Sequence, residues 1–103
     1  MAEILLFITT ESDKDLAKNL AKKIIEGKYA ACCTFNEISS IYRWKGDIEL
    51  TTEVEILIKS TPERLHDLIK IVKQESSYEM PQIIYKNFNS EDNYHNWVKK
   101  IVS

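Results

Sequence analysis

Polar and apolar residues alternate without a break along residues 48–59, and this is the clearest strand signal in the sequence. Because successive side chains of a strand point to opposite faces, one face receives a mainly aliphatic row and the other a row rich in glutamate. The mainly aliphatic row consists of Ile48, Leu50, Thr52, Val54, Ile56 and Ile58. Residues 4–8 are apolar without alternation, which is typical of a central strand buried on both faces.

Two more segments predict strands. The apolar runs 29–35 and 38–44 lie on either side of Asn36-Glu37, which interrupts them. Lys45-Gly46-Asp47 follows as a hairpin turn signal, so we expect this long region to fold back onto the alternating strand. Residues 81–88 predict a fourth strand that begins with a proline, where the missing N–H donor does least harm.

Three segments predict amphipathic helices. The first has Ser12 as its expected N-cap and stops at Gly27. The second opens at Thr61-Pro62, a cap followed by proline at the first helical position, and ends within residues 74–77. The third is capped by Ser90 and has an apolar face made of two aromatic and two aliphatic residues.

The order of elements is strand, helix, strand, strand, helix, strand and a C-terminal helix. Right-handed crossovers turn the βαββαβ part into a ferredoxin-like α+β sandwich, with a four-stranded antiparallel sheet and two helices on one face. We expect a single domain over residues 1–103, with an extended hairpin between the second and third strands. Since exposed strand edges and apolar faces are liabilities in a monomer, the helix-free sheet face predicts a homo-oligomer.

Composition limits the classes of function. The 103 residues carry 14 Lys plus Arg and 16 Asp plus Glu, a net charge of -2, so the basic footprint of a nucleic-acid-binding protein is missing. We see neither a membrane-spanning stretch nor a signal peptide, which predicts a soluble cytoplasmic protein without a membrane partner. The neighbours Cys32 and Cys33 point to opposite strand faces and exclude a disulfide framework. We expect Cys32 to face the core.

Catalytic motifs do not emerge from the sequence. With two glycines in the chain, neither a glycine-rich phosphate loop nor a Gly-x-Ser-x-Gly elbow is present. Glu53 and Glu55 share a strand face about 7 Å apart, a spacing compatible with acid–base chemistry, but a solvated or intersubunit sheet face explains them better. The histidines, His66 and His95, are expected at half-exposed surface positions. We therefore expect a protein that is not an enzyme.

Five short motifs occur in order along nearly the whole chain, and together they resemble the CutA family of divalent-ion tolerance proteins. Each motif is weak alone, but their order and spacing are specific. The motifs are Thr9-Thr10, Tyr29-Ala30-Ala31-Cys32, the Ser40 to Gly46 hairpin, Glu53-Val54 leading to Lys59-Ser60, and Tyr78-Glu79-Met80-Pro81. The last helix, with Tyr94 and Trp97, also fits the ending of this family.

The resemblance implies a ferredoxin-like homotrimer in which the long hairpin arms pair with neighbouring subunits. Arg43 and Lys59 are the candidate intersubunit residues of this trimer. The resemblance also implies a role in tolerance of, or response to, divalent metal ions such as copper, with weak metal binding.

This chain departs from the family where a metal ligand is usually proposed. Members typically carry His-Pro before the Tyr-Glu pair, whereas this chain has Ser76 and Ser77, and a neutral Gln82 replaces an acidic residue. Because copper prefers imidazole and thiolate ligands, the strongest candidate donor is absent. The remaining candidate metal ligands are Cys32, which would converge with its copies across a trimer axis, and Glu79. A divalent ion such as copper is the candidate cofactor.

A small-ligand site is the alternative. Tyr42, Trp44, Tyr78 and Glu79 are the candidate residues of a cleft near the hairpin and the start of the fourth strand. These side chains either lock subunit contacts or bind a small molecule or ion through ring faces, a hydroxyl and a carboxylate. Two hypotheses follow: a trimeric metal-response protein, or a trimeric scaffold or sensor that binds a small ligand or partner protein and no metal.

Overall fold

The computed structural model describes residues 2–103, which form four strands and three α-helices in the predicted order. A single 3-10 turn, η1 (Pro62–Arg64), precedes the second helix. The elements are β1 (Glu3–Glu11), α1 (Lys14–Glu26), β2 (Cys32–Trp44), β3 (Asp47–Ser60), α2 (Leu65–Glu75), β4 (Ile84–Asn89) and α3 (Asp92–Val102).

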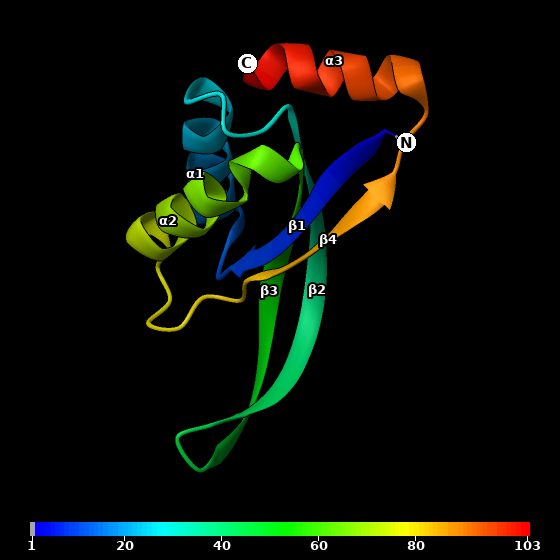
Figure 1. The fold of residues 1–103 in the computed structure, drawn as a ribbon. Coiled ribbons are helices and arrows are strands. Elements are labelled where there is room, and N and C mark those ends of the chain that lie inside the picture. Colours follow the sequence, from blue (N-terminus) through cyan, green and yellow to red (C-terminus); the bar gives the residue numbers. More distant parts are fainter. Residues whose placement is uncertain (1) are drawn as a thin grey trace.

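The sheet has the strand order β2-β3-β1-β4, and every neighbouring pair is antiparallel. Helices α1 and α2 lie together on one face, and α3 lies beyond the sheet end that holds the N-terminus (Figure 1). The predicted ferredoxin-like sandwich is confirmed, including the central position of β1 between β3 and β4. Among residues 2–103, no helix has the length and apolarity that crossing a bilayer requires.

The core lies between the sheet and the two helices. Alternate residues of β1 and β3 supply one side of it, with Leu5, Phe7, Ile56 and Ile58 almost completely buried. The prediction that residues 4–8 are buried on both faces is wrong, because alternate residues of β1 on the other face are only half-buried. The amphipathic helices supply the other side, through Ala17, Leu20, Ile24, Leu68 and Val72. The buried residues of the sheet and the apolar faces of α1 and α2 therefore pack into one core, as expected for a sheet covered by amphipathic helices.

Some predicted boundaries are wrong. Asp13, and not Ser12, caps α1, because its Oδ1 accepts the Leu16 N–H at 2.8 Å. The predicted break at Asn36-Glu37 is absent, since both residues are exposed members of a continuous β2 and pair with β3. Strand β4 begins at Ile84, three residues after Pro81.

The cap of α3 also differs from the prediction. Glu91 caps this helix, because its carboxylate accepts the N–H groups of Asn93 and Tyr94. The predicted cap, Ser90, instead donates its hydroxyl to the Glu91 carbonyl. Glutamate reaches the first-turn donors here as an aspartate or serine cap would.

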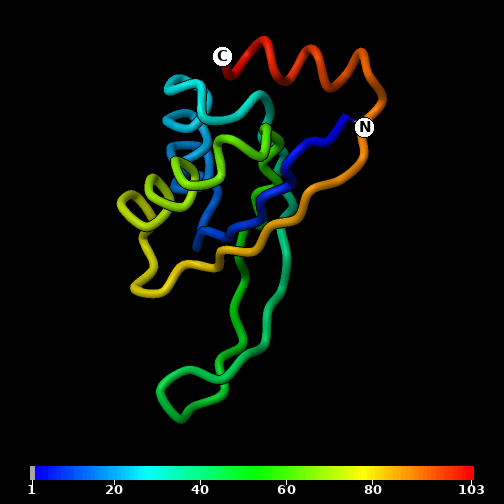
Figure 2. Tube along the Cα trace, in the orientation of Figure 1, coloured from blue at the N-terminus to red at the C-terminus, as the bar shows by residue number. Residues whose placement is uncertain are grey.

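The hairpin of β2 and β3 extends well beyond α1 and α2 (Figures 1 and 2). Its turn has Lys45 at φ 49° and Gly46 at φ 87°, positive angles at both central positions that match the twist of a tight hairpin. We call residues 54–60 of β3 the covered half and residues 47–53 the distal half. In the distal half the aliphatic row continues but is exposed.

Candidate functional site

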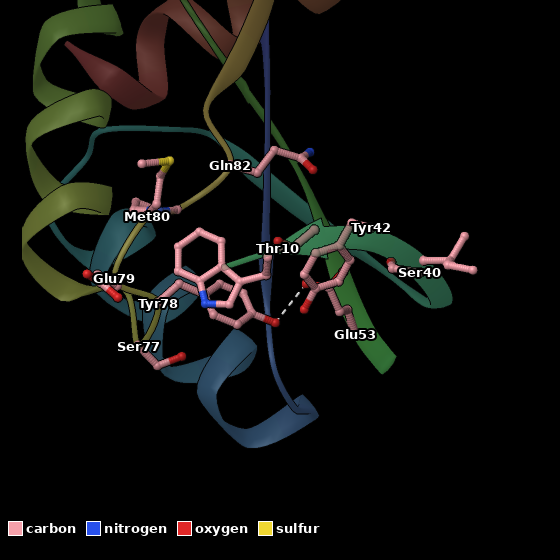
Figure 3. A pocket seen from close by; sticks show the side chains of 12 residues that line it. Thr10, Ser40, Tyr42, Glu53, Ser77, Tyr78, Glu79, Met80 and Gln82 are labelled. Carbon is pink, nitrogen blue, oxygen red and sulfur yellow. Dashed lines mark hydrogen bonds between the residues drawn. The ribbon is translucent and has the colours of Figure 1, made fainter. Parts of the chain in front are cut away.

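A cleft of about 730 Å³ lies where the segment between α2 and β4 meets the hairpin of β2 and β3. The four cleft residues predicted from the sequence, Tyr42, Trp44, Tyr78 and Glu79, all line it. Thr10 at the end of β1 and Glu53 of β3 line it as well (Figure 3). The structure therefore brings together residues that are up to about seventy positions apart in the sequence.

The floor of the cleft is organised by a hydrogen bond between two of these residues. The Tyr78 hydroxyl donates to Glu53 Oε2 at 2.7 Å, as the dashed line in Figure 3 shows. Desolvation, followed by the hydrogen bond to the Glu53 carboxylate, raises the pKa of Tyr78 well above its usual range. Tyr78 therefore stays a neutral donor at physiological pH, and Glu53 holds its ring in position.

A buried carboxylate anchors the same segment from below. Glu11 is only 1% exposed and accepts two hydrogen bonds from Ser77, one from its N–H at 3.1 Å and one from its hydroxyl. Ser76 Oγ adds a local bond by accepting the Tyr78 N–H at 3.1 Å. Such side-chain bonds to backbone donors substitute for secondary structure where the chain is irregular. Glu11 thus fixes the residue that precedes the cleft aromatic Tyr78.

At the outer rim, the turn of the hairpin meets the α2–β4 segment. The Lys45 ammonium lies 3.4 Å from Glu79 Oε2 and 5.6 Å from the centroid of the Trp44 ring. A cation in this position is attracted both by the carboxylate and by the negative face of the indole. The turn therefore presents its own positive charge to the cleft rim.

The prediction that Cys32 faces the core is wrong. Cys33 packs against the core and pairs with the buried Ile58, whereas Cys32 pairs with Lys59 on the opposite face. Cross-strand partners share a face, so the register of β2 on β3 decides the orientation. Burial, with a smaller effect of Cys32, raises the pKa of the Cys33 thiol to about 12.

The metal-ligand candidates do not gather into a centre. Within residues 2–103 there is no group of three or more His, Cys, Asp or Glu side chains that could hold an ion. Cys32 lies at the start of β2, while Glu79 lies at the cleft rim and pairs with Lys45. A structural metal centre requires about four convergent donors, so the donors of a single chain do not fit one.

The other candidates lie on the surface. His66 is exposed on α2 and His95 is half-buried on α3. Arg43 is exposed and pairs with Ile48 in the distal half, and Lys59 is half-buried at the far end of β3. The intersubunit role of Arg43 and Lys59 stays a prediction.

Sequence reasoning missed Glu11, Ser77 and the role of Glu53. Glu11 follows Leu5, Phe7 and Thr9 in steps of two, so continued alternation would have indicated that it faces inward. The strand pattern places Glu53 in a solvated or intersubunit row. Its contact with Tyr78 joins residues 25 apart and is set by the path of the α2–β4 segment, which leaves no periodic signal.

The fold and the cleft define a ferredoxin-like α+β domain with a long β2–β3 hairpin. Solved structures share it: CutA from Synechococcus elongatus superposes with a TM-score of 0.95 at 31% identity, covering all of this chain and 93% of that one. The periplasmic divalent cation tolerance protein CutA from Archaeoglobus fulgidus gives a TM-score of 0.94 at 27% identity, covering 97% of this chain and 99% of that one.

Sequence comparison identifies the family. The family model described as CutA1 divalent ion tolerance protein matches residues 5–101. A divalent-cation tolerance protein CutA from Yersinia pestis is 30% identical over 96 residues, covering 91% of this chain and 81% of the relative. The chain belongs to the CutA1 family, and the predicted resemblance is confirmed.

Proposed function

We propose that this chain acts, without catalytic chemistry, in the tolerance of or response to divalent metal ions such as copper. The family match over residues 5–101 carries this proposal, because the relatives are named for divalent-cation tolerance. The state of Cys33 argues against one catalytic route, attack by a cysteine nucleophile. A thiol with a pKa of about 12 stays protonated near neutral pH, where it is a poor nucleophile and a poor metal ligand.

The proposal assigns no metal centre to a single chain. Cys32 shares its face with Lys59, whose ammonium opposes a nearby cation, and Glu79 is engaged by Lys45. Metal contact is therefore assigned to the meeting point of several copies, where one Cys32 from each copy would supply a soft sulfur ligand. Such a site would be weak and would depend on assembly.

We propose that the assembly is a homotrimer. Large apolar side chains of the distal half and of β4 are exposed in the single chain, which supports burial against other copies. The most exposed of them are Ile48 at 66%, Leu50 at 76% and Ile84 at 53%, and Ile41 of β2, which pairs with Leu50, is 71% exposed. Light scattering on the purified protein should give the mass of three chains, and the mass of one chain would contradict the proposal.

Calorimetric titration with Cu²⁺ and Zn²⁺ tests the metal assignment. Saturable heat is expected for the native chain and should be lost in Cys32→Ser, while Glu79→Gln reports on the cleft rim. Glu63→Gln, an exposed carboxylate on η1, is the matched control and should leave the heat unchanged. The absence of heat with either metal in every sample would exclude metal binding by this chain.

A second function is favoured by the cleft. A volume of about 730 Å³ with three aromatic side chains in its lining is typical of small-molecule sites and far exceeds what one metal ion needs. We propose that this cleft, beside the apolar hairpin surface where copies would meet, binds a small ligand. The protein would then act as a scaffold or sensor whose ligand, and not a metal, is the signal.

The proposed location is the cytoplasm. Both cysteines are free thiols, which is the usual state in a reducing compartment. The A. fulgidus structure is called periplasmic, and the periplasm is therefore the alternative location. Cell fractionation with an antibody against the chain tests this assignment directly.

A further inference from the structure

The charge of the cleft lining has one sign. Among the lining residues that the structure describes, the charged side chains are two carboxylates, Glu53 on β3 and Glu79 on the α2–β4 segment. The rings of Tyr42, Trp44 and Tyr78 line the same space. The negative face of an aromatic ring attracts a cation, so rings and carboxylates favour the same kind of ligand.

Glu53 keeps one carboxylate oxygen available to a ligand. Tyr78 donates to one carboxylate oxygen, Oε2, at 2.7 Å, and a carboxylate has a second oxygen for another donor. The Tyr78 hydroxyl is a neutral donor at physiological pH, so its hydrogen bond to Glu53 brings no positive charge into the cleft. Glu53 is half-buried, and at such a position screening by water is weaker than at the open surface.

Lys45 is a cation of this chain that already contacts two residues of the cleft lining. Its ammonium lies between the Glu79 carboxylate, at 3.4 Å, and the Trp44 ring, with 5.6 Å to the centroid. Trp44 and Glu79 belong to segments that are far apart in the sequence but share the cleft lining. The chain therefore contains an internal example of a cation held by one ring and one carboxylate of this cleft.

We propose that the cleft binds a small organic ammonium cation, with its charge near Glu53 and Glu79 and its alkyl groups against the rings of Tyr42, Trp44 and Tyr78. This inference rests on the second proposed function, ligand binding by the cleft, and names the class of ligand. An anion would meet two carboxylates in the lining, and the rim cation Lys45 is already paired with Glu79. A bare metal ion would leave most of the 730 Å³ unused.

Choline is a suitable probe because its ammonium carries methyl groups that fit ring faces. Isothermal titration calorimetry is run with choline, with the neutral alcohol in which carbon replaces the ammonium nitrogen, and with acetate. The two alcohols have nearly the same shape, so their difference reports on charge alone. Choline is expected to bind at least about tenfold more tightly than the neutral alcohol, and acetate more weakly still.

Variants locate the binding. Glu53→Gln and Trp44→Leu are each expected to weaken choline about tenfold, by loss of charge and of a ring face. Lys45→Gln has the opposite expected effect, a several-fold gain, because it removes the ammonium that competes for Glu79 and Trp44. Trp97→Leu is the matched control: this half-exposed tryptophan lies on α3, outside the cleft lining, and should leave choline binding unchanged. Far-ultraviolet circular dichroism verifies that each variant is folded.

The outcomes separate this inference from the proposed function. Equal binding of choline and the neutral alcohol, preference for acetate, or weaker choline binding in Lys45→Gln would overturn the cation class while leaving a ligand-binding cleft. Binding that Trp97→Leu abolishes and the cleft variants do not would overturn the location. No binding of any probe by the native chain would overturn both the cation class and the cleft function.

Discussion

The covered and distal halves of β3 have the same alternating pattern but different surroundings. In the covered half Ile56 and Ile58 are fully buried beneath the helices, whereas in the distal half Ile48 and Leu50 are 66% and 76% exposed on the same face. Alternation therefore determines which face a side chain joins. The elements that cross this face determine whether the side chain is buried.

The candidate site lies at the boundary between these two halves. Glu11, the last residue of β1, pairs with Val54, the first residue of the covered half, and binds Ser77 beside the cleft. The adjacent Glu53, in the distal half, binds Tyr78. The α2–β4 segment is thus bound at two points. Ser77 is held by Glu11 beside the buried covered half, and Tyr78 is held by Glu53 of the exposed distal half.

The largest effect is expected from Ile58→Ala in the covered half. Removing most of a side chain with 0% exposure should lower the free energy of unfolding by about 2–5 kcal/mol. The substitution leaves a cavity that the packed helices fill only in part. Urea unfolding followed by circular dichroism measures it. A loss below about 1 kcal/mol would mean that the core relaxes around the cavity and that the two halves differ less than their exposure indicates.

At the boundary, Glu11→Ala is expected to lower the free energy of unfolding by about 1–3 kcal/mol, because it leaves the Ser77 N–H and hydroxyl without their buried acceptor. Ser77→Ala is the matched variant and should cost less, since the N–H bond to Glu11 remains. Both are measured in the same urea series. An effect of Ser77→Ala that equals or exceeds that of Glu11→Ala would contradict the anchoring role of the carboxylate.

In the distal half, Leu50→Ala should behave differently from Ile58→Ala. If Leu50 is buried against another copy, its loss of stability, roughly 1–2 kcal/mol, depends on protein concentration and disappears on dilution to single chains. Urea unfolding at two concentrations, with light scattering on the same samples, measures this dependence. A loss that is the same at both concentrations would place Leu50 in an intrachain contact and remove the contrast between the halves.

The sequence predicted the sandwich because its strands and helices have strong, uniform periods. Residues 48–59 alternate throughout, and the resulting faces agree with the core containing Ile56 and Ile58. Boundaries were less predictable, since Asp13 and Ser12, or Glu91 and Ser90, offer neighbouring side chains that can each cap a helix. The orientation of the cysteines depended on cross-strand register, which periodicity does not specify when both residues are small and moderately apolar.

The cleft was only partly predictable. Unusual clusters of aromatic residues singled out Tyr42, Trp44, Tyr78 and Glu79, and these do line one cleft. The contact from Glu11 to Ser77 joins residues 66 positions apart through an irregular segment, and no local pattern encodes such a contact. The Ser77 hydroxyl and N–H thus position the α2–β4 segment beside the cleft, and the sequence alone does not predict this position.

The smallest expected effect concerns the pH dependence of stability that the buried thiol of Cys33, opposite the covered half, should cause. Burial raises the pKa of Cys33 from 9.0 to about 12, so above pH 9 the unfolded chain releases this proton while the folded chain retains it. The unfolded state then binds fewer protons, and the free energy of unfolding falls as pH rises through the window from about 9 to 12. Below pH 9 both states hold the proton and the contribution is constant.

The Cys33 contribution is isolated by comparing variants over this window. The loss near pH 10 should be about 1.4 kcal/mol, and Cys33→Ala should remove it, giving a flatter pH profile than the native chain. Cys32→Ala is the matched control and should retain the slope, because burial is the larger cause of the Cys33 shift and Cys32 the smaller. Identical profiles for the native chain and Cys33→Ala would indicate that water reaches Cys33. The residues packed against the covered half at Ile58 would then be open to solvent, as the distal half is.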